Sequence, residues 1–150
     1  MICMNHEERY WQNLTTEANE FFNKSDFEKA LSIYKNALYR AEILNNNLQE
    51  CNRLKIPFMQ VYIISCNNLA NTYVELGNFD EAENMSKRSI YYLLHLASNK
   101  DLNLAEIHIE LRRASVNYVQ IAEKTNDGKL KQEQFFKTLK EQLTANNFYL

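Results

Sequence analysis

Two segments of the chain, residues 18–38 and 70–90, repeat one spacing of small and aromatic side chains. Each segment has a small residue, an aromatic three positions later, a turn that ends in Phe, and an alanine three residues after that Phe. The matching pairs are Ala18 and Ala70, Phe21 and Tyr73, Phe27 and Phe79, and Ala30 and Ala82. Such spacing is typical of antiparallel helix pairs, and repeated pairs stack into solenoids. Solenoids of this kind usually hold other molecules and do not transform them.

Turn-forming residues are scarce, which favours an all-α chain. The 150 residues include two Gly and one Pro, and no β-branched alternating run occurs. Connections should therefore be few and short. The length suits a single domain, 1–150, with one core. The apolar periodicity predicts about six helices, over residues 6–23, 25–48, 57–76, 78–97, 101–124 and 129–144.

Local signals mark several of the expected helix ends. Ser25 with Glu28 three residues later forms a capping-box pattern for the second helix. Pro57 stands near the first turn of the third helix, where proline is tolerated. Gly77 is placed to supply a left-handed C-cap for that helix. The segment Asn126–Gly128 predicts a turn before the last helix.

The repeated residues resemble the tetratricopeptide repeat, TPR. The second copy carries the resemblance at Leu69, Ala70, Tyr73, the run from Leu76 to Phe79, Ala82 and Ile90. The first copy carries it at Ala18, Phe21, Phe27, Ala30, Tyr34, Ala37 and Leu38. The resemblance implies a short right-handed TPR-like solenoid, with repeat 1 at about 6–50, repeat 2 at about 56–98 and a divergent pair at about 101–144.

Two departures from the family pattern affect the expected fold. The equivalent alanines Ala30 and Ala82 are 52 residues apart, against a usual period of about 34. We expect the extra residues to lengthen the second and third helices. The third pair matches poorly: with Tyr118 as its aromatic, Ser115 takes the small position, but no matching run follows Gly128.

No constellation of residues indicates catalysis, a metal or a cofactor. The three His form no HExxH pair, and two glycines cannot build a phosphate-binding loop. Cys66 is expected to pack in the core. Cys51 lies near Arg53 and Lys55, so it is either a helix-end packing residue, the favoured reading, or a reactive thiol. We therefore predict that the chain is not an enzyme.

Charge and cysteine usage limit the surroundings and partners. The net charge is -2, with both signs interspersed, which gives no field for nucleic acid or membrane. No apolar run reaches the ~18 residues of a membrane span, and the first residues do not resemble a signal peptide. Three Cys without a CxxC pair fit a cytoplasmic setting. The lysines of 129–144 are expected on a solvated helix face. Glu81 and Glu83 lie early in their helix, where negative charges interact favourably with the helix dipole.

The TPR resemblance places a peptide-binding groove on the first helix of each pair. Carried over to this sequence, its residues are Gln12, Thr15, Asn19, Asn67, Asn68 and Asn71, and then Ile109, Arg112, Arg113 and Val116. Amides can pair with a peptide backbone, and Arg with a carboxylate. In TPR domains that grip a terminal carboxylate, five residues act together; Asn19, Asn68 and Arg113 resemble three of them, whereas Thr15 and Ile109 replace both lysines.

Two classes of function stay open from the sequence. The first is a bacterial scaffold or adaptor that binds a protein or peptide, and the polar groove residues favour it. The second is a dedicated chaperone, because small type III secretion chaperones have TPR repeats and similar length. A homodimer is also left open, since adjacent Phe135 and Phe136 point to different sides of a helix, which leaves one ring for the C-terminal tail or a second subunit.

Overall fold

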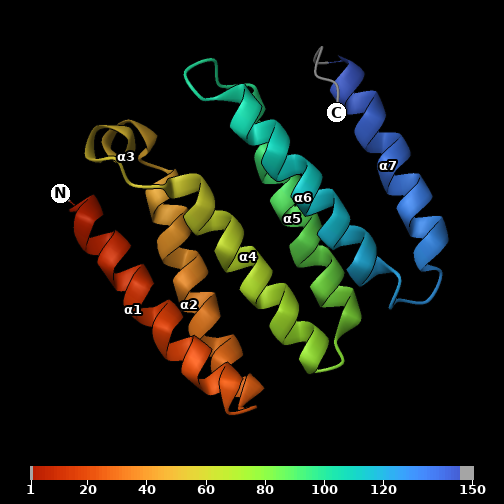
Figure 1. The fold of residues 1–150 in the computed structure, drawn as a ribbon, viewed down its shortest axis with the longest axis horizontal. Helices are drawn as coiled ribbons and strands as arrows, with labels where there is room; N and C mark the ends of the chain where they lie inside the picture. The colour runs from red at the N-terminus through yellow and green to blue at the C-terminus, as the bar shows by residue number, and fades with distance from the viewer. Residues whose placement is uncertain (1, 146–150) are drawn as a thin grey trace. The chain divides into compact units, whose positions relative to one another are not determined.

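The computed structural model describes residues 2–145, and in that range all regular structure is α-helical (Figure 1). Seven helices are present there, one more than the sequence predicts. They are α1 (Met4–Asn23), α2 (Phe27–Asn45), α3 (Leu48–Leu54), α4 (Phe58–Glu75), α5 (Phe79–Ala97), α6 (Leu104–Ala122) and α7 (Gly128–Ala145). Among the described residues, no helix combines the length and apolarity that crossing a bilayer requires.

The chain separates into two compact units, Met1–Asn78 and Phe79–Leu150. The first contains α1 to α4 and the second contains α5 to α7. Their boundary falls in the turn between the two helices of the second predicted repeat. Within the first unit, α1 and α4 run in the same direction and α2 runs opposite to both (Figure 1).

Small residues and a buried hydrogen bond between α1 and α4 help to hold the first unit together. Ala18 of α1 and Ala30 of α2 are fully buried, which is what a close helix approach requires. The indole Nε1 of Trp11 donates to Ser65 Oγ at 2.7 Å, and Ser65 Oγ donates to the carbonyl of Val61 at 2.8 Å. The Trp11–Ser65 bond fixes α1 directly against α4 and satisfies the only polar atom of a buried indole.

The second unit has an aliphatic and aromatic core. Leu93 of α5 and Leu111 and Tyr118 of α6 have no exposed surface. Phe135 of α7 is buried and its ring centroid lies 4.6 Å from that of Tyr118. Phe136 also contacts Tyr118, at 5.7 Å between centroids. Both adjacent rings thus contact Tyr118, and Phe136 is half-buried. That one ring is left for the tail or a second subunit stays a prediction, because residues 146–150 lie outside the described range.

The extra helix is α3, and it corrects the expectation that the inserted residues lengthen the neighbouring helices. Instead α2 ends at Asn45, and Leu48 belongs to α3. The side chain of Asn45 donates to the carbonyls of Ala41 and Phe58, at 2.8 and 3.1 Å, and Asn47 donates to Ile43 at 2.8 Å. Asn side chains that bond nearby carbonyls compete with helix continuation, so α2 stops at this run.

The cap of α2 also differs from its prediction, whereas other end signals are confirmed. Asp26 is the N-cap, and its carboxylate accepts from the backbone N–H of Lys29. Ser25, predicted as the cap, lies in the preceding turn with φ at 62°. Gly77 has φ at 75°, as a left-handed helix terminus requires. Pro57 precedes α4, and residues 126–127 form a turn before α7.

Candidate binding surfaces

The first candidate surface is the side of α1 and α4 on which Gln12, Asn19 and Asn71 lie by helical position; we call it the α1–α4 face. Trp11 and Ser65 mark where the two helices meet. Around each helix axis, the reference direction is that of Trp11 on α1 and of Ser65 on α4. At ~100° per residue, Gln12 and Asn19 lie ~80–100° from Trp11 to one side, and Asn71 lies ~120° from Ser65 to the other side. Because the helices run parallel, these opposite rotations bring the side chains onto one face.

Exposure on this face differs among the predicted residues. Gln12, Asn19 and Asn71 are exposed, whereas Asn67 and Asn68 are half-buried. The Asn19 side-chain oxygen accepts a hydrogen bond from Tyr34 Oη of α2, which leaves its NH₂ group to offer a ligand. By helical position Asn68 borders the α1–α4 contact, and Asn67 lies on the side of α4 remote from α1.

Thr15 and Ile64 change the composition of the α1–α4 face. Thr15 is half-buried, and its Oγ1 is buried with no hydrogen-bond partner among the described residues. Its helical position is ~40° from the contact direction, so the side chain lies beside the helix contact. Ile64, which the sequence reasoning missed, is exposed at 41% and precedes Asn68 by one helical turn. The sequence could have revealed Ile64 through its spacing, because a residue four positions before Asn68 lies on the same side of the helix.

The second candidate surface is one stripe along α6, formed by Ile109, Arg112, Arg113 and Val116; we call it the α6 stripe. All four side chains are exposed, Ile109 at 53% and Val116 at 58%. Their i, i+3, i+4, i+7 spacing gathers them on one face of the helix. Arg113 Nη1 lies 2.9 Å from Glu110 Oε1, an i,i+3 ion pair in which the arginine side chain is exposed and the glutamate side chain is mostly covered. The stripe thus combines two exposed aliphatic side chains with two guanidinium groups.

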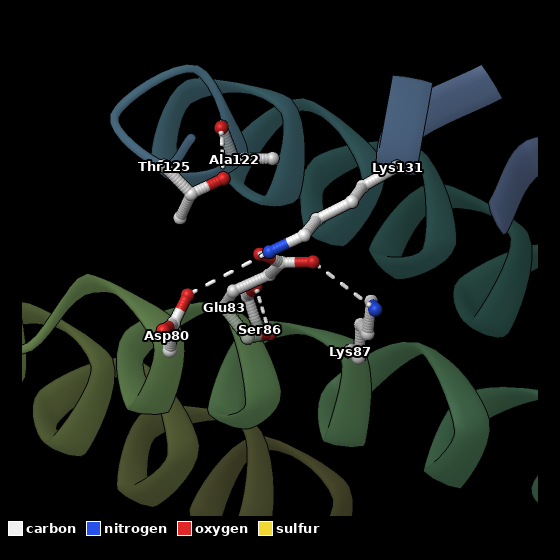
Figure 2. A network of polar contacts seen from close by, with 7 residues as sticks. All are labelled: Asp80, Glu83, Ser86, Lys87, Ala122, Thr125 and Lys131. Carbon is white, nitrogen blue, oxygen red and sulfur yellow. Dashed lines mark hydrogen bonds and ion pairs between the residues drawn. The ribbon is translucent and has the colours of Figure 1, made fainter. Parts of the chain in front are cut away.

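A third cluster, in the second unit, is a network of charges that the sequence did not predict (Figure 2). Glu83 of α5 is 3% exposed. Its carboxylate lies 3.1 Å from Lys87 Nζ of the same helix and 3.9 Å from Lys131 Nζ of α7. Lys131 also pairs with Asp80, at 3.7 Å. Glu83 is therefore a buried, paired carboxylate, which the expected helix-dipole role alone does not describe. The Lys131 side chain is 41% exposed, as expected for a solvated face, but it also pairs with two carboxylates.

The charge network borders the aromatic core of the second unit. Lys87 Nζ lies 5.4 Å from the ring centroid of Phe135 and 5.9 Å from that of Tyr118, within cation–π range. Burial, and next the negative charge of Glu83, raise the pKa of Tyr118 to about 12. The phenol therefore stays neutral at ordinary pH and does not add a second negative charge beside the buried carboxylate.

The thiol of Cys51 has the properties of a packing residue. Cys51 is fully buried in α3, and its Sγ lies 3.3 Å from the carbonyl oxygen of Leu44. Burial, followed by the charges of Glu8 and Glu50, raises its pKa to about 11, which opposes the thiolate needed for reactivity. Cys66 is also fully buried, as predicted. Among residues 2–145, no group of three or more His, Cys, Asp or Glu could hold a metal ion.

Comparison with family models places residues 9–145 in the family described as "Protein of unknown function (DUF2753)". That match covers most of the chain, so the chain belongs to this family. The search of curated proteins and the search of solved structures each find no match.

Proposed function

We propose that this member of the family is a non-enzymatic scaffold of TPR-like architecture that binds a protein or peptide. The stacking of its helix pairs into a right-handed solenoid, which the sequence predicts, is part of the proposal. The cytoplasmic, bacterial setting expected from the sequence belongs to the same proposal.

The α6 stripe is the observation that carries this function. Exposed aliphatic side chains are unremarkable singly, but here Ile109 and Val116 share a face with two arginines. Binding hot spots are rich in Arg beside apolar surface from which water can be excluded. A guanidinium also binds a carboxylate through two parallel hydrogen bonds. The stripe therefore suits a peptide with apolar side chains and an acidic side chain or terminal carboxylate.

The α1–α4 face supports the proposal through amide chemistry. Asn71 and Gln12 are exposed there, and each side-chain amide can both donate and accept. Such groups match the N–H and C=O groups of a peptide backbone whatever its sequence. Exposed Ile64 adds an apolar contact to the same face. In this function the amides of the α1–α4 face hold a peptide backbone, and Arg113 of the α6 stripe separately recognises the charge of a ligand at its own surface.

Arg113 must give up or share an existing partner in order to bind. Its Nη1 is already paired with Glu110, whose side chain is 15% exposed. A ligand carboxylate therefore competes with Glu110 for the guanidinium. Removing the Glu110 charge should strengthen binding of an acidic peptide, and removing Arg113 should weaken it.

The test is titration of the purified chain with a library of fluorescent acidic peptides, each made with a free and an amidated C-terminus, followed by anisotropy. Arg113→Ala should weaken binding by ~1.5–3 kcal/mol and Asn71→Ala by ~0.5–1.5 kcal/mol, the usual losses for charged and neutral hydrogen bonds. Glu110→Gln should tighten it. Added salt should reduce the contribution of Arg113.

Arg53→Ala is the matched control, because Arg53 is an exposed arginine with its own i,i+3 glutamate, Glu50. This variant should bind as the parent chain does. Equal affinity of Arg113→Ala, Asn71→Ala and the parent, with helicity intact, would remove both surfaces from the proposed function.

A chaperone is the second candidate, and the exposure of Ile64, Ile109 and Val116 favours it. These side chains make the two surfaces more apolar than their Asn and Arg residues alone suggest. A chaperone would hold an apolar segment, so its binding should survive Arg113→Ala and high salt but be lost in Ile109→Ser or Val116→Ser. The same titrations thus separate the two functions.

A further inference from the structure

Helix α7 is attached to the rest of its unit along a single line of side chains. Lys131, Phe135, Leu139 and Leu143 follow one another at intervals of four residues, and the last three are buried. A spacing of four keeps side chains on one side of a helix. This line meets the carboxylates of Asp80 and Glu83 and the rings of Tyr91 and Tyr118. We call these contacts the α7 seam.

The connection between α6 and α7 is short and conformationally constrained. It consists of residues 123–127, and Asp127 has φ at 58°, a conformation that L-residues seldom adopt. Gly128, the first residue of α7, has no room for a side chain, because an added Cβ would run into the backbone carbonyl of Ala122. In Figure 2 that carbonyl is labelled together with Thr125, whose Oγ1 donates to it at 2.8 Å. The closed turn thus depends on both positions.

We propose that α7 is an exchangeable helix, which docks onto α5 and α6 of a second copy of this chain when the 123–128 hinge opens. The surface that receives α7 within one chain is identical in every copy. Lys131 and Phe135 therefore find the same carboxylates and rings between chains as within one. Exchange conserves the seam and releases the constrained turn in both copies, and short strained hinges are known to favour such swapping.

Concentration decides between the closed monomer and the swapped dimer. A segment on a short connection meets its own chain at an effective concentration of the order of millimolar. The parent chain should therefore be monomeric at micromolar concentration. A substitution that forbids the closed turn but spares the seam removes this advantage, and α7 can then dock only in another copy.

Two hinge variants test the proposal for independent reasons. Gly128→Ala places a methyl group against the carbonyl of Ala122. Asp127→Pro fixes φ near -65° and so excludes the observed positive φ; Asp127→Asn, which tolerates that conformation, is its matched control. Multi-angle light scattering should show dimers for Gly128→Ala and Asp127→Pro, each with a dimer dissociation constant at least ~10-fold below that of the parent chain. Asp127→Asn should remain a monomer. Monomeric Gly128→Ala and Asp127→Pro would overturn the proposal.

Seam variants then show whether the dimer uses α7. Adding Phe135→Ala to Gly128→Ala should return the mass to that of a monomer, because the central ring of the seam is lost. Lys131→Met should weaken the same dimer more mildly. Leu130→Ala is the matched control on α7, since Leu130 is 56% exposed, and it should leave the dimer intact. A dimer that persists without Phe135 and Lys131 would place the interface elsewhere and refute the exchange.

Discussion

The three cysteines of this chain differ sharply in environment, and their reactivity should follow. Cys3 is exposed, whereas Cys51 and Cys66 are buried. The pKa of Cys51 is raised to about 11, so at pH 8 its thiolate, the reactive form, is scarce as well as inaccessible. We expect one thiol to react rapidly with Ellman's reagent in the native chain and all three after unfolding. The variant Cys3→Ser should show no rapid thiol; a rapid Cys51 signal there would contradict the structure.

The buried carboxylate of Glu83 makes the two lysines beside it unequal. Lys87 Nζ is nearer, at 3.1 Å, and its side chain is less exposed than that of Lys131. Removing one partner leaves a buried charge poorly compensated. Lys87→Met should therefore lower the free energy of unfolding by roughly 1–3 kcal/mol, and Lys131→Met by under about 1 kcal/mol, because exposed pairs are screened.

Lys129→Met is the control for Lys87→Met and Lys131→Met. Lys129 is exposed on the first turn of α7, the helix that also carries Lys131. Its effect in urea unfolding should stay within about 0.5 kcal/mol. Adding Glu83→Gln to Lys87→Met should recover part of the loss, because the uncompensated charge is then gone. Equal effects of all three lysine substitutions would mean that the carboxylate is solvated.

At the scale of single elements, the start of α2 distinguishes two capping residues. Asp26 accepts from the backbone of Lys29, whereas Ser25 adopts a positive φ in the turn before it. Asp26→Ala should therefore cost ~0.5–2 kcal/mol, as lost N-caps do. Ser25→Gly should be neutral or stabilising, because glycine adopts positive φ without steric cost. Thermal unfolding of both variants checks this; a larger loss for Ser25→Gly would restore the capping role predicted for Ser25.

The helices could be predicted where periodicity and a strong terminal signal agree. The apolar spacing located α1, α2 and α4 to α7, and Gly77 and Asp127 mark their turns as expected. The prediction of one continuous helix to residue 48 was wrong at Asn45 and Asn47. Apolar periodicity continues there, but the two asparagine side chains bond nearby carbonyls and stop the helix. Propensity patterns do not register such local competition, so α3 was missed.

The surroundings of the predicted binding residues were harder to predict from the sequence than the positions of the helices. Exposure of Asn71 and Arg113 follows from helical position alone. The hydrogen bond between Asn19 and Tyr34 and the burial of Thr15 Oγ1 depend on packing between helices. Likewise, Glu83 and Lys131 are 48 residues apart, and only the fold brings their charges together. Partners distant in sequence leave no local pattern.

At the scale of the whole molecule, the repeat connects positions in both units. Ala30 lies in the first unit and Ala82 in the second, and both are fully buried. The sequence aligns them as equivalent residues of two helix pairs. Trp11, the single tryptophan, belongs to the first unit, so its fluorescence reports directly on the packing that includes Ala30.

If the repeat alignment identifies equivalent packing positions, enlarging either alanine should have a similar effect. Ala30→Leu and Ala82→Leu should each lower the free energy of unfolding by ~1–3 kcal/mol, because a larger side chain must displace close neighbours. Ala105→Leu on α6 is the control, since Ala105 is exposed and should change stability by under about 0.5 kcal/mol. Urea unfolding followed by far-UV circular dichroism measures all three, and Trp11 fluorescence gives a second reading for Ala30→Leu. Losses no greater than that of Ala105→Leu would show that the aligned alanines do not lie at tight helix contacts, and the duplicated spacing would then lose its structural meaning.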